Sequence, residues 1–460
     1  MFDTVGGLFV FVAQGRNLVP VGEASFLARQ VEHFRAGGVR TVLRKCLKLL
    51  TLAISWPVAF VVTIGIRLMS PIVLVRVGWL FSSRMGNLAR WPEIYLCRRD
   101  TGVSFERKRI VDIWFHSSIP SNSFLAEMWK HELHIGPRWV FRRVDFLQRR
   151  LPNTEKYLQP QSWEFEDDLG CHISTTSAHL KFSNAEIARG HNELKLLGIP
   201  SGAKYVCLMV RDSAYLAQHR PGEDWSFYHY RDGRIEDYLL AAEKLTEKGY
   251  LVVRMGATAD TRLRSENKMI IDYAFYENRN EFLDIYLGAH CEFAIGTGVG
   301  LEEIPVIFRR PVCYTGVINW KVALSRGYLM VGKKYFNEKT NEFLSLRQIL
   351  EFEAKSNFSM DKNYYESSGI IPQHNSPKEI ADLVLEMESR VSQRWTDPPD
   401  SDELQARFWK ALSDVGLELT TRKGFGISYG PGISFVGYEF LKINQDWFLP
   451  EVAKMRSITK

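Results

Sequence analysis

The sequence predicts an α/β protein with two Rossmann-like domains, preceded by an N-terminal segment that contains an apolar helix. Two patterns carry this prediction. Apolar runs of strand length alternate with runs of helical periodicity over most of the chain, and a long uncharged run precedes the first of them. Strands that alternate with helices form parallel sheets, so a ligand site is expected at the carboxyl ends of the strands.

The composition is that of a folded globular protein. The 460 residues are 45% hydrophobic and 24% charged, which excludes a disordered chain, a collagen-like repeat and a small disulfide-stapled fold. At roughly 150 residues per domain, this length accommodates two or three domains. With 59 Lys and Arg against 53 Asp and Glu, the net charge of +6 is too small an excess to predict a nucleic-acid partner.

An uncharged run of 18 residues, LLTLAISWPVAFVVTIGI, lies at Leu49–Ile66. As a helix it is about 27 Å long, close to the thickness of a hydrocarbon core. It could span the membrane, with the basic residues at 40–48 in the cytoplasm. It could lie in the membrane surface as a monotopic or re-entrant element, because Pro57 would kink it and Arg67 and Arg76 follow it. It could also be a buried core helix.

The first α/β unit follows this run and ends near Pro200. Apolar strands are expected at Ile72–Val77 and Arg109–Phe115, and a Ser-capped helix at Ser121–His131. We therefore divide the chain into an N-terminal segment at 1–70, a first Rossmann-like domain at 71–200, a second at 201–395 and a C-terminal tail at 396–460. The proline-rich, acidic stretch Thr396–Asp402 is the expected linker to that tail.

The second unit shows the alternation most clearly. A strand at Tyr205–Val210 is followed by a helix at Ile235–Lys248, whose apolar residues share one face, and Gly249 is expected to cap that helix. The elements expected after it are strands at 250–255, 292–295 and 311–314 and helices at 281–289 and 301–308. This order predicts a doubly wound sheet.

A glycine-rich turn in the second unit is the first candidate for ligand binding. Gly296, Thr297, Gly298 and Gly300 follow a strand and precede a helix that begins with Leu301-Glu302. Glycines allow a close approach of the backbone to a ligand, and free N–H groups at a helix start favour an anion such as a pyrophosphate. The alternative is a tight turn with glycines for steric reasons only, in which Glu302 serves the helix start rather than a ribose hydroxyl.

Two arginines follow neighbouring strands of the same unit. Arg211 comes directly after one strand, and Arg254, with Gly256 close behind, ends the next. Both side chains are expected in the crevice beside the glycine turn, where guanidinium groups hold a diphosphate by paired hydrogen bonds. The alternative is that they form salt bridges, for example with Asp212 or Asp272. Asp212 is also a candidate general base towards an acceptor hydroxyl.

Other chemistries lack their sequence signals. The six cysteines form no CxxC pair and no HExxH is present, so we expect no metal site and no bound cofactor. A nicotinamide site would place its glycines in the first βαβ unit, with an acid about 20 residues further on. The glycines here come in the fourth strand-like segment, which disfavours an oxidoreductase.

Five segments of the chain resemble a family of predicted glycosyltransferases encoded in bacterial surface-polysaccharide clusters. They are VCLMVRDSAYL (206–216), YRDGRIEDYLLAAEKLTEKGYLVVRMG (230–256), IIDYA (270–274), EFLDIYLGAHCEFAIGTGVGL (281–301) and LSLRQIL (344–350). The resemblance implies a GT-B-like fold of two facing Rossmann-like halves, in which the C-terminal half holds the nucleotide sugar and no metal is needed. The chain is also distantly similar to fucosyltransferases of this type, in which an arginine at the place of Arg211 contacts the donor diphosphate. Family members carry a polar residue and a serine where this chain has Gly298-Val299-Gly300.

The resemblance implies a function that joins these features. A sugar would pass from a nucleotide sugar to a lipid-linked glycan or polysaccharide acceptor, on the cytoplasmic face of the bacterial inner membrane, with a monotopic or peripheral attachment. Two alternatives share the architecture. A sugar-nucleotide epimerase would use the same diphosphate site without an acceptor, and a non-catalytic assembly subunit would keep the fold without the site.

Overall fold

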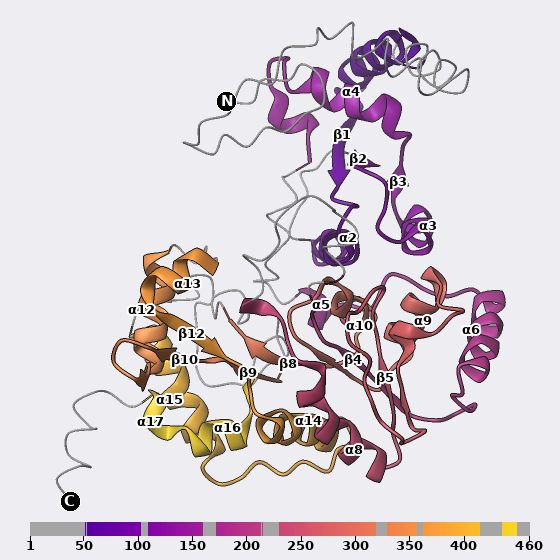
Figure 1. Cartoon of the computed structure of the whole chain (residues 1–460). Coiled ribbons are helices and arrows are strands. Elements are labelled where there is room, and N and C mark those ends of the chain that lie inside the picture. Colours follow the sequence, from indigo (N-terminus) through magenta and orange to yellow (C-terminus); the bar gives the residue numbers. More distant parts are fainter. Residues whose placement is uncertain are drawn as a thin grey trace, which may run out of the picture.

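The computed structural model describes residues 51, 53–102, 109–159, 172–212, 214, 230–318, 329–356, 362–414 and 435–448. Most of the predicted 1–70 segment, including Leu49, Leu50 and Leu52 of the uncharged run, lies outside the described residues, and so do residues 415–434 of the tail. The described chain is an α/β protein with two parallel sheets in two units, an N-terminal and a C-terminal one (Figure 1). The predicted α/β class is thereby confirmed.

The N-terminal unit is built on a three-stranded sheet in the order β1-β2-β3. β1 pairs with β2 in parallel from Val73 opposite Arg109 to Leu80 opposite His116. One face of this sheet is covered by the helix at 53–69 and by α4, and the other by α2 and α3. The elements of this unit are β1 (Val73–Leu80), α2 (Met85–Asp100), β2 (Arg109–His116), α3 (Ser123–Glu132), β3 (His134–Ile135), α4 (Arg138–Gln148) and the 3₁₀ helix η1 (Thr154–Tyr157).

The C-terminal unit is built on a seven-stranded sheet in the order β13-β9-β8-β7-β4-β5-β6, in which every pair is parallel. The strands are β4 (Tyr205–Met209), β5 (Leu251–Arg254), β6 (Ile270–Ile271), β7 (Ala294–Gly296), β8 (Val312–Val317), β9 (Leu329–Gly332) and β13 (Phe435–Val436). The predicted doubly wound order is confirmed, because the chain runs from β4 outward to β6 and then returns to β7 on the other side of β4.

Helices cover both faces of this sheet. One layer holds η4 (Ile235–Tyr238), α8 (Leu239–Glu247) and α14 (Pro377–Val391), and the other holds α6 (Asn184–Leu196), α9 (Glu281–His290), η6 (Gly300–Glu302) and α10 (Glu303–Ile307). Gly249 follows α8 with a φ of 88°, as expected of a C-terminal cap. α6 precedes the predicted boundary at residue 200 but packs on α9, where Gly190 lies against the ring of Tyr286. The short elements α5 (His172–Thr175) and η5 (Tyr273–Phe275) complete this region.

The C-terminal part of the chain adds a small antiparallel sheet in the order β11-β10-β12. Its elements are β10 (Lys334–Asn337), β11 (Glu342–Phe343), α12 (Leu346–Lys355), α13 (Lys362–Ser368) and β12 (Ile370–Gln373). The tail contributes α15 (Ser401–Ser413), β13, α16 (Tyr438–Ile443) and α17 (Gln445–Phe448). β13 pairs with β9, so the tail completes the edge of the large sheet.

The two units meet through α2, which lies between them (Figure 1). At its first turn the backbone of Gly86 approaches Gly300 so closely that a Cβ on Gly300 would lie 2.7 Å from the Gly86 nitrogen. One helical turn further on, buried Arg90 pairs with Glu303 at 3.0 Å. The end of the predicted glycine turn therefore lies at the contact between the units.

The helix at 53–69 packs on the first sheet through Ala59 and Ile66. Its larger apolar side chains point outward: Phe60 is 57% exposed, Val61 69% and Leu68 74%. The interpretation of this segment as a buried core helix is therefore wrong. Within the described residues, no helix combines the length and the apolar character that crossing a bilayer requires.

The contact between α6 and α9 gives a first prediction. Gly190→Ala would place a Cβ 2.1 Å from the Tyr286 ring, which is fully buried and has no room to move. We expect the free energy of unfolding to fall by about 1–3 kcal/mol, because overpacking outweighs the better helix propensity of alanine. Thermal and urea unfolding of the full chain would measure this. The control is Gly65→Ala, whose Cβ meets nothing within 4 Å; equal stability of both variants would contradict the packing.

Candidate functional site

The candidate site lies where the strand order reverses in the large sheet. β4 pairs with β5 on one side and with β7 on the other, and Met209 is opposite Gly296 at the carboxyl ends of β4 and β7. The chain leaves these two strands towards opposite faces of the sheet, and the crevice that this leaves is the usual ligand position in such folds. The segments after Met209 and Gly296, which contain the predicted Arg211 and glycine turn, are therefore neighbours.

A side-chain hydroxyl ties these two strand ends together. The backbone N–H of Arg211 donates to Thr297 Oγ1 at 2.8 Å, and Thr297 Oγ1 lies 3.5 Å from the carbonyl oxygen of Met209. On the other side of β7, Thr315 Oγ1 donates to the Gly296 carbonyl at 3.2 Å. The threonine in the glycine turn thus fixes the path of the backbone at Arg211.

The glycine turn is shaped by Glu302 beneath it. Gly298 has a φ of 83°, which favours glycine, and its N–H donates to Glu302 Oε2 at 3.1 Å. A Cβ on Gly296 would lie 2.2 Å from the same oxygen. Because Glu302 is fully buried, its predicted contact with a ribose is wrong: its carboxylate holds the turn from inside. Gly298, Val299 and Leu301 are half-buried, and Gly300 is exposed.

Arg211 lies beside a second arginine that the sequence analysis did not single out. Arg211 Nε is 3.3 Å from Asp232 Oδ1, and Arg231 Nη2 donates to the carbonyl oxygen of Gly298 at 3.3 Å. Burial lowers the pKa of Arg211, and the charge of Arg231 lowers it further, whereas Asp232 acts in the opposite direction. Two guanidinium groups therefore meet beside the glycine turn.

A lysine adds a third cation to this cluster. Lys333 directly follows β9, and its Nζ donates to the carbonyl oxygens of Tyr230 and Asp232 at 2.8 and 3.2 Å. Burial is the main reason why its pKa falls to about 8, and the nearby Arg231 lowers it as well. Lys333 thus holds the segment that carries Arg231 and Asp232. We call Arg211, Arg231 and Lys333 the cation cluster.

Arg254 does not join the cation cluster, so its predicted convergence with Arg211 is wrong. Its Nη1 lies 3.3 Å from Asp272 Oδ2 and also donates to the Thr261 carbonyl, and its Nη2 lies 3.7 Å from Asp212 Oδ2. The salt-bridge alternative describes it better, because Arg254 is buried between these acids. Gly256 follows on the same side, where a Cβ would meet Ala274 at 3.3 Å.

Asp212 is also engaged in the structure. Its Oδ1 accepts the N–H of Ala214 at 3.1 Å, and its Oδ2 accepts the N–H of Asp260 at 3.2 Å. Burial raises its pKa, which these hydrogen bonds and Arg254 oppose. Both oxygens therefore shape the loop after β4, and the role of Asp212 as a general base stays a prediction.

The space inside this region is small. A cavity of about 10 Å³ lies between Thr297, Arg231 and Lys333, lined also by Gly316, His374 and Asn375. That volume holds about one water molecule, so a larger anion would lie at the accessible side of the turn rather than within. Burial, and then the charge of Lys333, lower the pKa of His374 to about 4, which leaves its imidazole neutral at pH 7.

Arg231 and Lys333 of the cation cluster were not predicted, because the sequence around them only weakly indicates a binding site. Arg231 stands in the segment YRDGR, which looks like any polar loop, and Lys333 follows a strand that was not predicted. The position of Lys333 directly after an apolar run, LMVG at 329–332, was the one usable signal. The same rule that selected Arg211 would have selected it.

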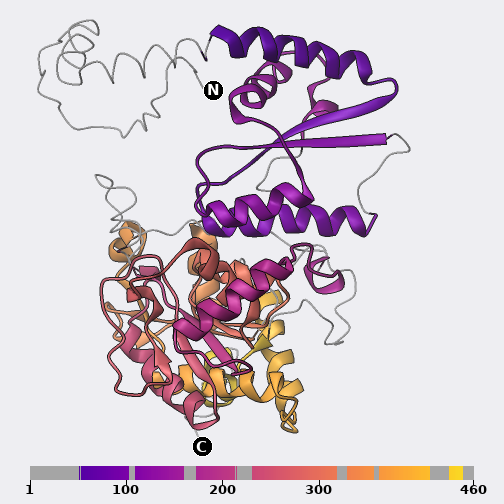
Figure 2. The same ribbon diagram turned by 90° about the vertical axis from the view of Figure 1, so that its right-hand side faces the viewer.

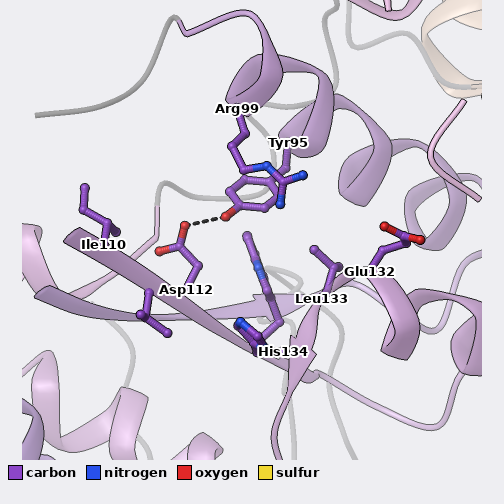
Figure 3. A pocket seen from close by; sticks show the side chains of 9 residues that line it. Tyr95, Arg99, Ile110, Asp112, Glu132, Leu133 and His134 are labelled. Carbon is purple, nitrogen blue, oxygen red and sulfur yellow. Dashed lines mark hydrogen bonds between the residues drawn. The ribbon is translucent and has the colours of Figure 1, made fainter. Parts of the chain in front are cut away.

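A larger cavity of about 240 Å³ lies in the N-terminal unit, away from these residues (Figure 3). Tyr95 and Arg99 of α2 face Asp112 of β2 and His134 of β3 across it. Tyr95 donates to Asp112, which also accepts two hydrogen bonds from Arg76 at 2.7 and 2.8 Å. Burial raises the pKa of the Tyr95 hydroxyl, so this group stays protonated. No pattern in the sequence predicts this cavity.

One group of side chains in the described residues has the spacing of metal ligands. An oxygen of Glu93, the sulfur of Cys97 and a ring nitrogen of His179 lie within 4.8 Å of one another. Arg309 Nη2 lies 2.6 Å from Glu93 Oε1 and 3.5 Å from Cys97 Sγ. Because a guanidinium already occupies the space between these groups, we interpret them as an ionic contact between the two units.

No protein-family model matches the sequence, and no curated protein matches it. Among solved structures, a glycosyl transferase family 9 protein from Veillonella parvula is similar at 9% identity and a TM-score of 0.30, over 52% of this chain and 79% of that chain.

Two further solved structures are similar at the same low level. The ADP-heptose LPS heptosyltransferase II of E. coli has 14% identity and a TM-score of 0.29, over 52% of this chain and 84% of that chain. A proposed UDP-N-acetylglucosamine 2-epimerase from Listeria monocytogenes has 11% identity and a TM-score of 0.26, over 71% of this chain and 98% of that chain. By their names, the three are two glycosyltransferases and an epimerase. The distant likeness to fucosyltransferases stays a prediction.

Proposed function

We propose that this protein is a GT-B-like glycosyltransferase that moves a sugar from a nucleotide sugar to a lipid-linked glycan or polysaccharide acceptor, without a bound cofactor or metal. The observation that carries this proposal is the cation cluster beside the glycine turn at the β4/β7 switch point. Guanidinium and ammonium groups at the carboxyl edge of a doubly wound sheet suit the diphosphate of a nucleotide sugar.

Sugar transfer from a nucleotide sugar requires a site that stabilises the negative charge of the departing diphosphate. As the bond between the sugar and the diphosphate breaks, positive charge develops on the sugar ring and negative charge on the departing diphosphate. Fixed cations aimed at the diphosphate stabilise that transition state more than the ground state. In the proposal, Arg211 and Arg231 supply paired N–H donors, and Lys333 adds charge and holds Arg231 in place.

The acceptor and the location are part of the same proposal. The N-terminal unit would bind the acceptor, and the protein would work on the cytoplasmic face of the bacterial inner membrane, as a monotopic or peripheral protein. The outward apolar side chains of the helix at 53–69 favour an acceptor at a lipid surface over a soluble one. An epimerase, which releases a free sugar nucleotide, has no need of that surface.

The experiment that decides between these functions uses the full chain. A panel of ADP-, UDP-, GDP- and dTDP-sugars is screened for thermal stabilisation, because a ligand of the folded state raises the melting temperature. The stabilising sugar is then incubated with and without a bacterial lipid extract. Transfer to lipid supports the proposal. Conversion of the sugar without lipid indicates an epimerase, and no stabilisation by any donor indicates a scaffold.

The cation cluster predicts the effect of removing one arginine. Arg231→Ala should weaken binding of the matching nucleoside diphosphate at least tenfold and lower turnover by about a hundredfold, because one charge-assisted donor is lost. Calorimetric titration and initial rates would measure these effects.

The matched control is Arg189→Ala, an exposed arginine on α6 that pairs with Glu193. It should leave both quantities unchanged. Arg231→Ala with normal diphosphate affinity and a normal melting temperature would remove the cation cluster from the proposal.

The lowered pKa of Lys333 predicts that the affinity for a nucleoside diphosphate depends on pH. Its pKa of about 8 means that the ammonium loses its charge as the pH rises from 7 to 9. Nucleoside diphosphate affinity should therefore fall by up to about tenfold over this range, because the positive charge of a lysine near the phosphates is lost. Titrations at constant ionic strength would show this.

The variant Lys333→Met tests whether Lys333 is the group whose titration weakens diphosphate binding. The variant should bind the diphosphate weakly at pH 7 and show little further loss up to pH 9. A fall in its affinity as steep as that of the parent protein would assign the titration to another group.

A further inference from the structure

We propose that the helix at 53–69 and α4 together form a surface that binds bilayers rich in anionic lipids. This inference stands on the N-terminal unit alone and does not depend on the proposed transferase activity. We call the outward apolar side chains of the helix at 53–69 the apolar face, and the arginines of α4 and of the two residues that follow it the basic rim.

In the helix at 53–69, most of the large apolar side chains point away from the protein, whereas a surface helix usually turns them towards it. The side that packs on the protein is formed by the small residues Ser55, Ala59 and Thr63 and by Ile66, all of them almost fully buried. The opposite side carries large apolar groups, and these exposed residues are Ile54, Trp56, Val58, Phe60, Val61, Ile64, Leu68 and Met69. A helix in contact with water on its outer side would place its large apolar residues inward. The exposed side therefore fits an apolar medium.

The basic rim lies next to the apolar face. Residues 138–150 contain five arginines and one aspartate. Arg143 lies over the ring of Trp56 at 5.6 Å, and the same ring contacts Phe146 edge-on at 5.4 Å. Trp139, which is 44% exposed, adds an aromatic side chain of the kind found at bilayer interfaces.

The arginines are held near the surface by contacts that leave their charge available. Arg143 Nη1 donates to the carbonyl of Trp139 at 2.6 Å, and Arg150 Nη1 donates to the carbonyl of Phe146 at 3.0 Å. Neither contact neutralises a guanidinium. Arg149 pairs with Asp145, the only acid in α4. The basic rim is thus positive overall, and lipid phosphates would complement it.

The position of this surface in the molecule fits the same partner. In both views the helix at 53–69 lies at the end of the N-terminal unit that points away from the C-terminal unit (Figure 2). Arg67 fixes that end, with hydrogen bonds to Gln148 Oε1 at 2.9 Å and to the Pro152 carbonyl at 2.8 Å. The helix is therefore anchored to the folded unit and would meet a bilayer side-on.

Two variants of the full chain test the two parts of this surface by co-sedimentation with vesicles. Val61→Ser/Leu68→Ser changes exposed side chains only, so the fold should persist, and partitioning should fall at least tenfold on every vesicle because two apolar contacts are lost. Arg142→Glu/Arg150→Glu should reduce binding at least tenfold to vesicles with about 30% phosphatidylglycerol and leave binding to pure phosphatidylcholine little changed.

The controls are Leu196→Ser and Lys195→Glu, two exposed residues of α6 in the C-terminal unit that should change neither result. Raising NaCl from about 50 to about 500 mM should weaken binding of the parent protein to anionic vesicles only. Full binding by both double variants would overturn the proposal and place the attachment in residues 1–50. A parent protein that forms a dimer, loses it in Val61→Ser/Leu68→Ser and does not bind vesicles would overturn it in favour of a second copy.

Discussion

The hydrogen bond from the Arg211 N–H to the Thr297 hydroxyl is the contact on which the candidate site depends. β4 and β7 are neighbours in the sheet, but the chain leaves them in different directions, so the ladder between them ends at Met209 and Gly296. Beyond this point the backbone groups need other partners. Thr297 provides one, and it thereby fixes the relative position of Arg211 and the glycine turn. Every later feature of the site, including the meeting of Arg211 with Arg231, follows from that position.

Arg254 and the cation cluster lie at the same edge of the sheet but differ in their surroundings. Arg254 is buried between Asp272 and Asp212, so its charge is compensated within the protein. Around the glycine turn, Arg211, Arg231 and Lys333 lie close together beside Asp232. Burial is the main reason why the pKa values of Arg211 and Lys333 are lowered, and the charge of Arg231 lowers both further. An anion at the turn would offset the repulsion between these cations, which makes the cation cluster the better candidate for ligand binding.

The sequence predicted the parts of this structure that depend on local pattern. Long apolar strands such as 205–209, the helix after Ile235 and the C-cap at Gly249 follow from periodicity and turn chemistry. β6 and β13 have two residues each, too few to show any periodicity, and were not predicted. The direction in which a side chain points at the end of a strand also depends on the tertiary fold, so the sequence pattern does not predict it.

Arg211 and Arg254 show that the partners of a side chain at a strand end depend on the tertiary fold. Arg211 and Arg254 both follow strands, and sequence spacing treats them alike. Their partners come from distant segments, Asp232 for the first and Asp272 for the second, and only the fold decides which arginine is compensated. Glu302 is similar: an acid at a helix start is usually solvated, but here the missing side chain of Gly296 lets its carboxylate fill the space under the turn.

The layered N-terminal unit connects the surface at 53–69 with the switch point and sets the distance between them. The helix at 53–69 lies on one face of β1 and β2, and α2 lies on the other face and contacts Gly300 through Gly86. Packed layers of secondary structure lie roughly 10 Å apart, so two such layers put the glycine turn some 20 Å or more from a bilayer at the apolar face. A lipid phosphate at the membrane surface would not reach that far. In the proposed orientation, the acceptor therefore has to be a glycan that already extends from its lipid, so the sugar would be added to a growing chain rather than to the lipid itself.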